Sequence, residues 1–256
     1  MMTQSLVHSP LEKPVSELIR TIACLDVTQG NRKMDVVWAI VSENKVQHQQ
    51  LQGINSVMKW VEEHQPTVFA IDAPCKKNQG KTEREEVRQE HGLGKKRYNC
   101  RIAEALLARC NIQRYSTPKN PSQESWISTG FALYDRLTQE LSYEIWDTPG
   151  QIVIPEDGEK VLLEVYPHAS FVVGIGARPK NKATLSGTLE RMAYLITDGN
   201  KASPSFHGEE WPDEAVLKGI LDRFETLSWQ SIRTQGVGLP SLPSHDLLDA
   251  LAGLLT

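Results

Sequence analysis

The sequence is poor in cysteine, in long apolar runs and in excess charge of either sign, and each lack excludes a class of protein. Its four cysteines, Cys24, Cys75, Cys100 and Cys110, form no CxxC pair and no metal-site spacing, so reduced thiols are expected. No apolar run is long enough to span a bilayer, and the polar, proline-interrupted start of the sequence leads us to expect no signal peptide. A formal net charge of -4 excludes a generally basic nucleic-acid coat but permits a local basic patch. We therefore expect a soluble cytoplasmic protein without a membrane partner.

The pattern of apolar residues predicts a single α/β domain. Residues 1–18 are expected to form an N-terminal extension, and residues 19–256 one domain with a charged insertion near 75–100. Apolar runs predict strands in residues 20–30, 34–42, 67–75 and the start of 160–175, and the turn SEN predicts a more polar strand in residues 45–51. Helical spacing predicts helices in residues 53–65, 100–110, 125–141, the end of 160–175, 182–197, 212–227 and 245–256. This order indicates a mixed five-stranded sheet, with an antiparallel hairpin start and then parallel strands, flanked by helices.

Three of the predicted strands each carry one acidic residue where burial would normally exclude it. These residues are Asp26 in the first strand, Asp72 in the fourth and Glu164 in the fifth. An ionised carboxylate is rarely buried unless it is paired or bound to a metal, because its desolvation is costly. Each acid alone also has an ordinary explanation. Asp72 would cap a turn before Ala-Pro, Asp26 would accept hydrogen bonds from the turn that follows it, and Glu164 would pair with an arginine.

The last predicted helix, HDLLDALAGLLT, carries two further acids among its apolar residues. Asp246 stands in the first turn, where a carboxylate favours the helix dipole and Ser244 is the expected N-cap. That explanation covers Asp249 less well. Three small residues follow Asp249: Ala250, Ala252 and Gly253. They would let this helix approach the sheet edge closely enough for its acids to join those of the strands.

Acids on adjacent strand ends and on a helix packed against them would form one carboxylate cluster. Asp26 and Asp72 both end their runs, at the edge where ligand sites form in α/β sheets. Crowded carboxylates raise one another's pKa and destabilise the fold unless cations compensate them. Oxygen ligands without cysteine or histidine spacing favour Mg²⁺ or Mn²⁺ over zinc. Two such ions about 3.5–4 Å apart activate a water and stabilise the leaving oxygen in phosphoryl displacement.

In strand order and in the positions of these acids, the sequence resembles the ribonuclease H-like superfamily. It resembles more closely a domain family of unknown function, number 429, whose members are described as predicted ribonuclease H-like nucleases. The resemblance runs from about Asp26 to the C-terminus through IDAP, RIAEALL, RYSTP, EVYPHASF, KATLSGTLERMAYL and HDLLDALAG, in that order. The resemblance implies a ribonuclease H-like fold.

The same resemblance implies functional roles for particular residues. The implied catalytic metal ligands are four acids, with one more as a further ligand: Asp26, Asp72, Glu164 and Asp249, then Asp246. The implied phosphate-binding residues are three cationic side chains in the matching pieces: Arg101, Lys182 and Arg191.

The segment between Lys76 and Arg101 follows Asp72 closely and carries nine basic residues against four acidic ones. It is expected to form a flap that contacts a phosphate backbone, in particular through Lys95, Lys96 and Arg97. The equally weighted alternative is a solvated insertion of mixed charge. A final candidate, His168, would orient a water or a phosphate, whereas its ordinary role would be capping or packing near a helix start.

The leading hypothesis is a nuclease that hydrolyses phosphodiester bonds of nucleic acid with two Mg²⁺ or Mn²⁺ ions. One alternative is a catalytically inactive nucleic-acid-binding or scaffold protein of the same fold, favoured if Asp26, Glu164 or Asp249 points away from the other acids. Another is an ATP-dependent phosphotransferase of the actin and sugar-kinase type, although the sequence lacks its glycine-rich turn and duplicated domain. The sequence does not indicate whether the substrate is DNA or RNA, nor what the oligomeric state is. A homodimer is one option, because junction-cleaving relatives act as dimers.

Overall fold

The computed structural model describes residues 21–40, 45–96, 98–122, 125–146, 155, 158–197, 205–206 and 245–255. Several predictions fall outside these residues. They are the N-terminal extension at 1–18, the helix at 212–227, the N-cap Ser244 and the nucleic-acid contact Arg97.

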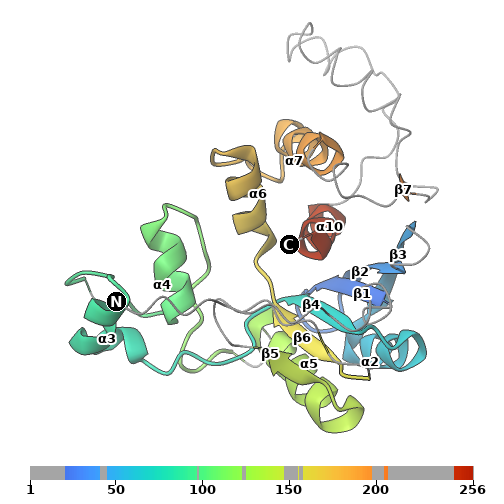
Figure 1. Ribbon diagram of the computed structural model, residues 1–256, viewed down its shortest axis with the longest axis horizontal. Coiled ribbons are helices and arrows are strands. Elements are labelled where there is room, and N and C mark those ends of the chain that lie inside the picture. Colours follow the sequence, from blue (N-terminus) through green and yellow to red (C-terminus); the bar gives the residue numbers. More distant parts are fainter. Residues whose placement is uncertain are drawn as a thin grey trace, which may run out of the picture.

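A mixed sheet forms the centre of the molecule (Figure 1). Its described strands are β1 (Thr21–Asp26), β2 (Lys33–Ile40), β3 (Lys45–Gln52), β4 (Val68–Asp72), β5 (Glu144–Trp146), β6 (Val161–Glu164) and β7 (Ser205–Phe206). They lie in the order β5-β6-β4-β1-β2-β3-β7. The pairs β1–β2 and β2–β3 are antiparallel, and all other neighbours in this sheet are parallel.

The predicted α/β class and the antiparallel start followed by parallel strands are confirmed. The predicted count of five strands is wrong, because the described sheet has six strands even without the two-residue β7. The additional strand β5 has three residues, and β7 has two. Segments this short show neither alternation nor an apolar run, so they give no signal in the sequence.

Helices cover both faces of the sheet (Figure 1). On one face lie α2 (Gly53–His64) and α5 (Trp126–Leu141), and on the other lie α6 (Pro167–Ile175), α7 (Leu185–Thr197) and α10 (His245–Leu255). The first face buries Leu25 and Phe69 in its core, whereas the second buries Leu248 and Leu251. Helix α10 packs directly on β1, β2 and β4. These contacts bring the C-terminal helix to the centre of the sheet.

The charged insertion lies between β4 and α5 and folds into short helices. These are η2 (Lys81–Glu83) and α3 (Glu85–Glu90), and α4 (Ile102–Arg109), which the sequence predicted as a separate helix, follows them; all three project away from the sheet (Figure 1). A small apolar cluster of Leu93, Cys100 and Ala105 supports them. Across the described residues, no helix has the length and apolar character needed to cross a membrane.

Candidate functional site

The register between β1 and β4 places two acids side by side. Asp26 is the last residue of β1, and its registered partner on the parallel strand β4 is Asp72, also a last residue. Because side chains alternate along a strand and registered partners share a face, both carboxylates lie on the same side of the sheet. Asp26 is only 8% exposed, and Asp72 is partly buried. The C-terminal ends of β1 and β4 therefore hold two adjacent acids that are shielded from water.

Helix α10 adds a third acid, Asp249, which is 6% exposed. Four residues later, Gly253 lies on the same face of the helix, against β1. A methyl group added at Gly253 would overlap the Sγ atom of Cys24 and lie 3.3 Å from Cγ2 of Val165. A larger residue would therefore hold α10 away from the strand. The close approach expected from the small residues of this helix is confirmed.

The three carboxylates act on one another electrostatically. Burial raises the pKa of Asp26 well above its ordinary value, and the charges of Asp72 and then Asp249 raise it further. Burial and then the charge of Asp249 raise the pKa of Asp72 to about 8, while Lys182 acts in the opposite direction. Asp246, in the first turn of α10, adds a smaller repulsion to both groups. The cluster therefore favours a positively charged ligand.

Lys182 is the cationic side chain closest to this cluster among those whose contacts are described. Its Nζ atom donates to Oδ2 of Asp249 at 2.7 Å. Burial alone would lower the pKa of Lys182, but the charge of Asp249 and this hydrogen bond raise it, so the ammonium stays protonated. Lys182, which was predicted to bind phosphate, thus lies beside Asp249, and its positive charge offsets part of the repulsion among the acids.

Arg191, on helix α7, contacts the backbone two residues before Lys182 and is only 2% exposed. Its Nη1 atom donates to the carbonyl oxygens of Lys180 at 3.0 Å and Gly187 at 2.9 Å. Burial lowers the pKa of this guanidinium, which also stacks over the ring of Phe171. In this position Arg191 braces the segment that leads to Lys182. The expectation that it meets phosphate directly does not agree with its burial.

Glu164 does not join the other acids. Its registered partner on β4 is Ile71, whose side chain lies in the core between the sheet and helices α2 and α5. The side chain of Glu164 therefore leaves its strand on that face of the sheet, and not on the face covered by α10. Its Oε2 atom accepts hydrogen bonds from Nη1 of Arg101 at 2.7 Å and from the backbone N–H of Cys75 at 2.9 Å. Its Oε1 atom accepts a further hydrogen bond from Nη2 of Arg101. The pairing with an arginine, offered above as its ordinary explanation, is what the structure shows.

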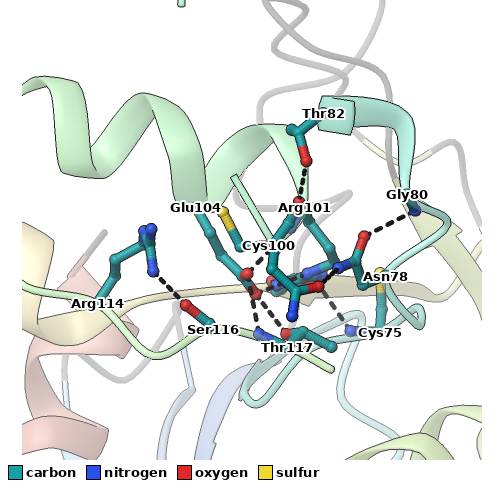
Figure 2. Close-up of polar contacts among 12 residues, drawn as sticks. Cys75, Asn78, Gly80, Thr82, Cys100, Arg101, Glu104, Arg114, Ser116 and Thr117 are labelled. Atoms are coloured by element: carbon teal, nitrogen blue, oxygen red, sulfur yellow. Dashed lines mark hydrogen bonds and ion pairs between the residues drawn. The ribbon is translucent and has the colours of Figure 1, made fainter. Parts of the chain in front are cut away.

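Arg101 is held between the carboxylates of Glu164 and Glu104, of which Figure 2 labels Glu104. Besides its pair with Glu164, its Nε atom donates to Oε1 of Glu104 at 2.9 Å. Glu104 is 6% exposed and accepts a hydrogen bond from the backbone N–H of Thr117 at 3.0 Å. Sequence reasoning missed Glu104, although an acid inside the apolar helix RIAEALL was the available signal. This network ties the insertion to the end of β6.

The remaining described candidates are Lys95, Lys96 and His168. Lys95 and Lys96 are exposed on the insertion, and Nζ of Lys96 stands 5.8 Å from the ring centre of Tyr98. The Nε2 atom of His168 is buried without a hydrogen-bond partner in the described structure. Burial, and after it the charge of Arg191, lowers the pKa of His168. Tyr166 was not predicted. Its hydroxyl group donates a hydrogen bond to the carbonyl oxygen of Gln113, and burial and then the charge of Asp72 raise its pKa.

Comparisons with known proteins identify the family alone. Neither the curated proteins nor the solved structures give a match to this chain. A family model described as "protein of unknown function (DUF429)" matches residues 25–256, a range that includes every candidate residue named above. The chain therefore belongs to the DUF429 family of proteins of unknown function.

Proposed function

We propose that this protein is a Mg²⁺- or Mn²⁺-dependent nuclease with a ribonuclease H-like fold. The observation that carries the proposal is the cluster of Asp26, Asp72 and Asp249, brought together by two adjacent strands and a facing helix. Burying such charges is costly unless cations compensate them. The fold assignment rests on the antiparallel start of the sheet, the parallel β4 beside β1, and an acid at the end of each of these two strands.

The donor set suits hard divalent cations. The cluster offers carboxylate oxygens, which Mg²⁺ and Mn²⁺ prefer, and the pKa of its nearest thiol, Cys24, is raised first of all by burial. In the described part of the chain, no three histidine, cysteine or acidic side chains already surround one point as metal ligands. Lys182 neutralises one charge at Asp249, which leaves the repulsion between Asp26 and Asp72 for bound ions to offset.

The chemistry assigned to the chain follows from these positions. Bound divalent ions would supply Lewis-acid stabilisation and an acidified water for attack on a phosphodiester. Asp26, Asp72 and Asp249 would hold these ions through their carboxylate oxygens. Lys182 presents an ammonium that can pair with a non-bridging phosphate oxygen beside Asp249. His168, with its unpartnered Nε2 atom, is suited to orienting a water or the phosphate.

A cleavage assay tests this proposal. Labelled DNA and RNA, each as single strands, duplexes and branched junctions, would be incubated with the protein and Mn²⁺. We expect cleavage of at least one substrate, lost in Asp26→Asn and in Asp249→Asn. The matched control is Asp135→Asn, an exposed acid of α5 on the opposite face of the sheet, which should leave cleavage unchanged. Cleavage that survives in both site variants would contradict the proposal.

The second candidate is a nucleic-acid-binding protein of the same fold without turnover. One observation favours it. Glu164, which was expected among the metal ligands, is bound to Arg101 and to the backbone of Cys75 instead. Binding of nucleic acid in Mn²⁺ without any cleavage would support this second candidate over the first.

A further inference from the structure

A pocket of about 310 Å³ opens between the loop after β4 and the start of α4. Its volume lies at the lower end of the range for small-ligand sites. Four cationic side chains and one carboxylate take part in its lining: Lys76, Lys77, Lys81, Arg101 and Glu164. The charge of Arg101 is already met by Glu164 and Glu104. The lysines therefore determine the charge of the ligand that this pocket favours.

Two of these lysines are available to a ligand. Lys77 and Lys81 are exposed, and within the described residues neither forms an ion pair with a carboxylate. The carboxylate closest in sequence, Glu83, pairs with Lys119 instead, at 2.7 Å between Nζ and Oε1. An ammonium group without a protein partner is a strong ligand for phosphate oxygens.

The loop that carries the lysines is fixed at both ends (Figure 2). At its start, the backbone N–H of Cys75 donates to Glu164, and at its end, Oγ1 of the fully buried Thr82 donates to the carbonyl oxygens of Tyr98 and Cys100. Between them, Oδ1 of the buried Asn78 accepts a hydrogen bond from the backbone N–H of Gly80 at 2.8 Å. The backbone is thus ordered before a ligand arrives, which lowers the entropic cost of binding.

The pocket adjoins the acid cluster along the chain and in space. Its first residue, Cys75, follows Asp72 by three positions, and Glu164 in its wall is the registered partner of Ile71, the residue before Asp72. A strand with a phosphodiester at the acids would therefore have further phosphates within reach of the lysines. Binding of successive phosphates by lysine side chains is the usual source of affinity for nucleic acid.

We propose that this pocket binds a backbone phosphate of a nucleic-acid strand, beside the phosphodiester held at Asp26, Asp72 and Asp249. The position of the nucleic-acid strand in this inference rests on the proposed function, whereas the preference of the pocket for phosphate does not. The same chemistry would recognise the phosphate of a free nucleotide, so the experiment has to separate the two sources.

The test is binding of fluorescein-labelled oligothymidylate and oligouridylate, followed by anisotropy over a range of NaCl concentrations in EDTA. We expect Lys77→Gln/Lys81→Gln to weaken binding by on the order of tenfold at low salt. Loss of the one phosphate neutralised by the pocket should also reduce the slope of log K against log salt by about 0.7, the value for one phosphate on a single strand. The matched control is Lys59→Gln/Lys160→Gln, two lysines away from this pocket. An unchanged affinity and slope in the pocket variant, with control and variant equally stable, would overturn the inference.

Competition by AMP and by inorganic phosphate separates the sources of the ligand. If the wild type binds AMP but no oligonucleotide, the assignment to a strand is wrong. Because EDTA removes divalent ions, these measurements are independent of cleavage. Binding that depends on the pocket lysines, without cleavage in Mn²⁺, would contradict the proposed nuclease and support the phosphate pocket. Cleavage and binding that are both unchanged in the pocket variant would support the nuclease and contradict the phosphate pocket.

Discussion

Replacing Gly253 with alanine tests whether close approach of α10 to β1 builds the site. If the helix had room, the substitution would stabilise the fold by up to about 1 kcal/mol, because alanine has the higher helix propensity. The structure predicts the opposite sign. The new methyl would meet Cys24 Sγ so closely that the helix or the thiol must move by roughly 1 Å to reach van der Waals distance. Overpacking of this kind costs about 1–3 kcal/mol.

The double variant Cys24→Ala/Gly253→Ala isolates the cause. Removing the sulfur leaves the Cβ atom of residue 24 at 3.6 Å from the added methyl, an ordinary contact distance. Part of the overlap is thereby relieved, so the two substitutions should be coupled by about 1–3 kcal/mol. Urea denaturation of the wild type, both single variants and the double variant measures this coupling energy.

The same variants report on the site. A displaced α10 carries Asp249 away from Asp26, so Mn²⁺ should bind Gly253→Ala more weakly than the wild type and regain affinity in the double variant. A Gly253→Ala protein that is more stable than the wild type, or a coupling energy near zero, would refute the proposed role of this close packing.

Three further predictions concern charge. Lys182→Met should destabilise the metal-free protein by at least about 1 kcal/mol, because a buried carboxylate loses its partner, and should increase the thermal stabilisation given by Mn²⁺. The control Lys180→Met, at an exposed position nearby, should do neither. Arg101→Lys should speed hydrogen exchange in residues 75–101, since lysine cannot keep the paired hydrogen bonds to Glu164 or the bond to Glu104; unchanged exchange would contradict this. The folded pKa of Asp72, about 8, exceeds the ordinary 3.8, so its protonated form stabilises the fold at low pH and this stability is lost as pH rises from about 4 to 8. Urea denaturation without divalent ions should show that decline, by at most about 6 kcal/mol, and Asp72→Asn should remove most of it.

Local patterns were sufficient to predict most described elements. Helical spacing gave the limits of α2 and α5 within a residue, the apolar runs gave the strands β1, β2, β4 and β6, and the turn after β2 gave β3. The small residues of the last helix correctly predicted its close approach to the sheet, because only glycine fits against Cys24 at that point. These features depend on neighbours in the sequence or on the size of one side chain.

The composition of the site depends on register, which local patterns do not contain. Asp26 and Asp72 share a face because they are registered partners, whereas Glu164 is registered one position earlier on β4, with Ile71. A shift of one residue reverses the direction of a side chain, so an acid on a buried strand is equally consistent with either face. The burial of Arg191 likewise follows from how α7 packs, and its charge alone could not predict it.

The most direct test of the central claim is a calorimetric titration of Mn²⁺ into the wild type, Asp26→Asn and Asp249→Asn. It requires no substrate, and it asks whether the end of β1 and the helix α10 belong to one cation site. We predict saturable binding in the wild type that is lost or strongly weakened in each variant. Binding of the same affinity and stoichiometry in both variants would contradict the account, because the carboxylates at the end of β1 and on α10 would then not form a metal centre.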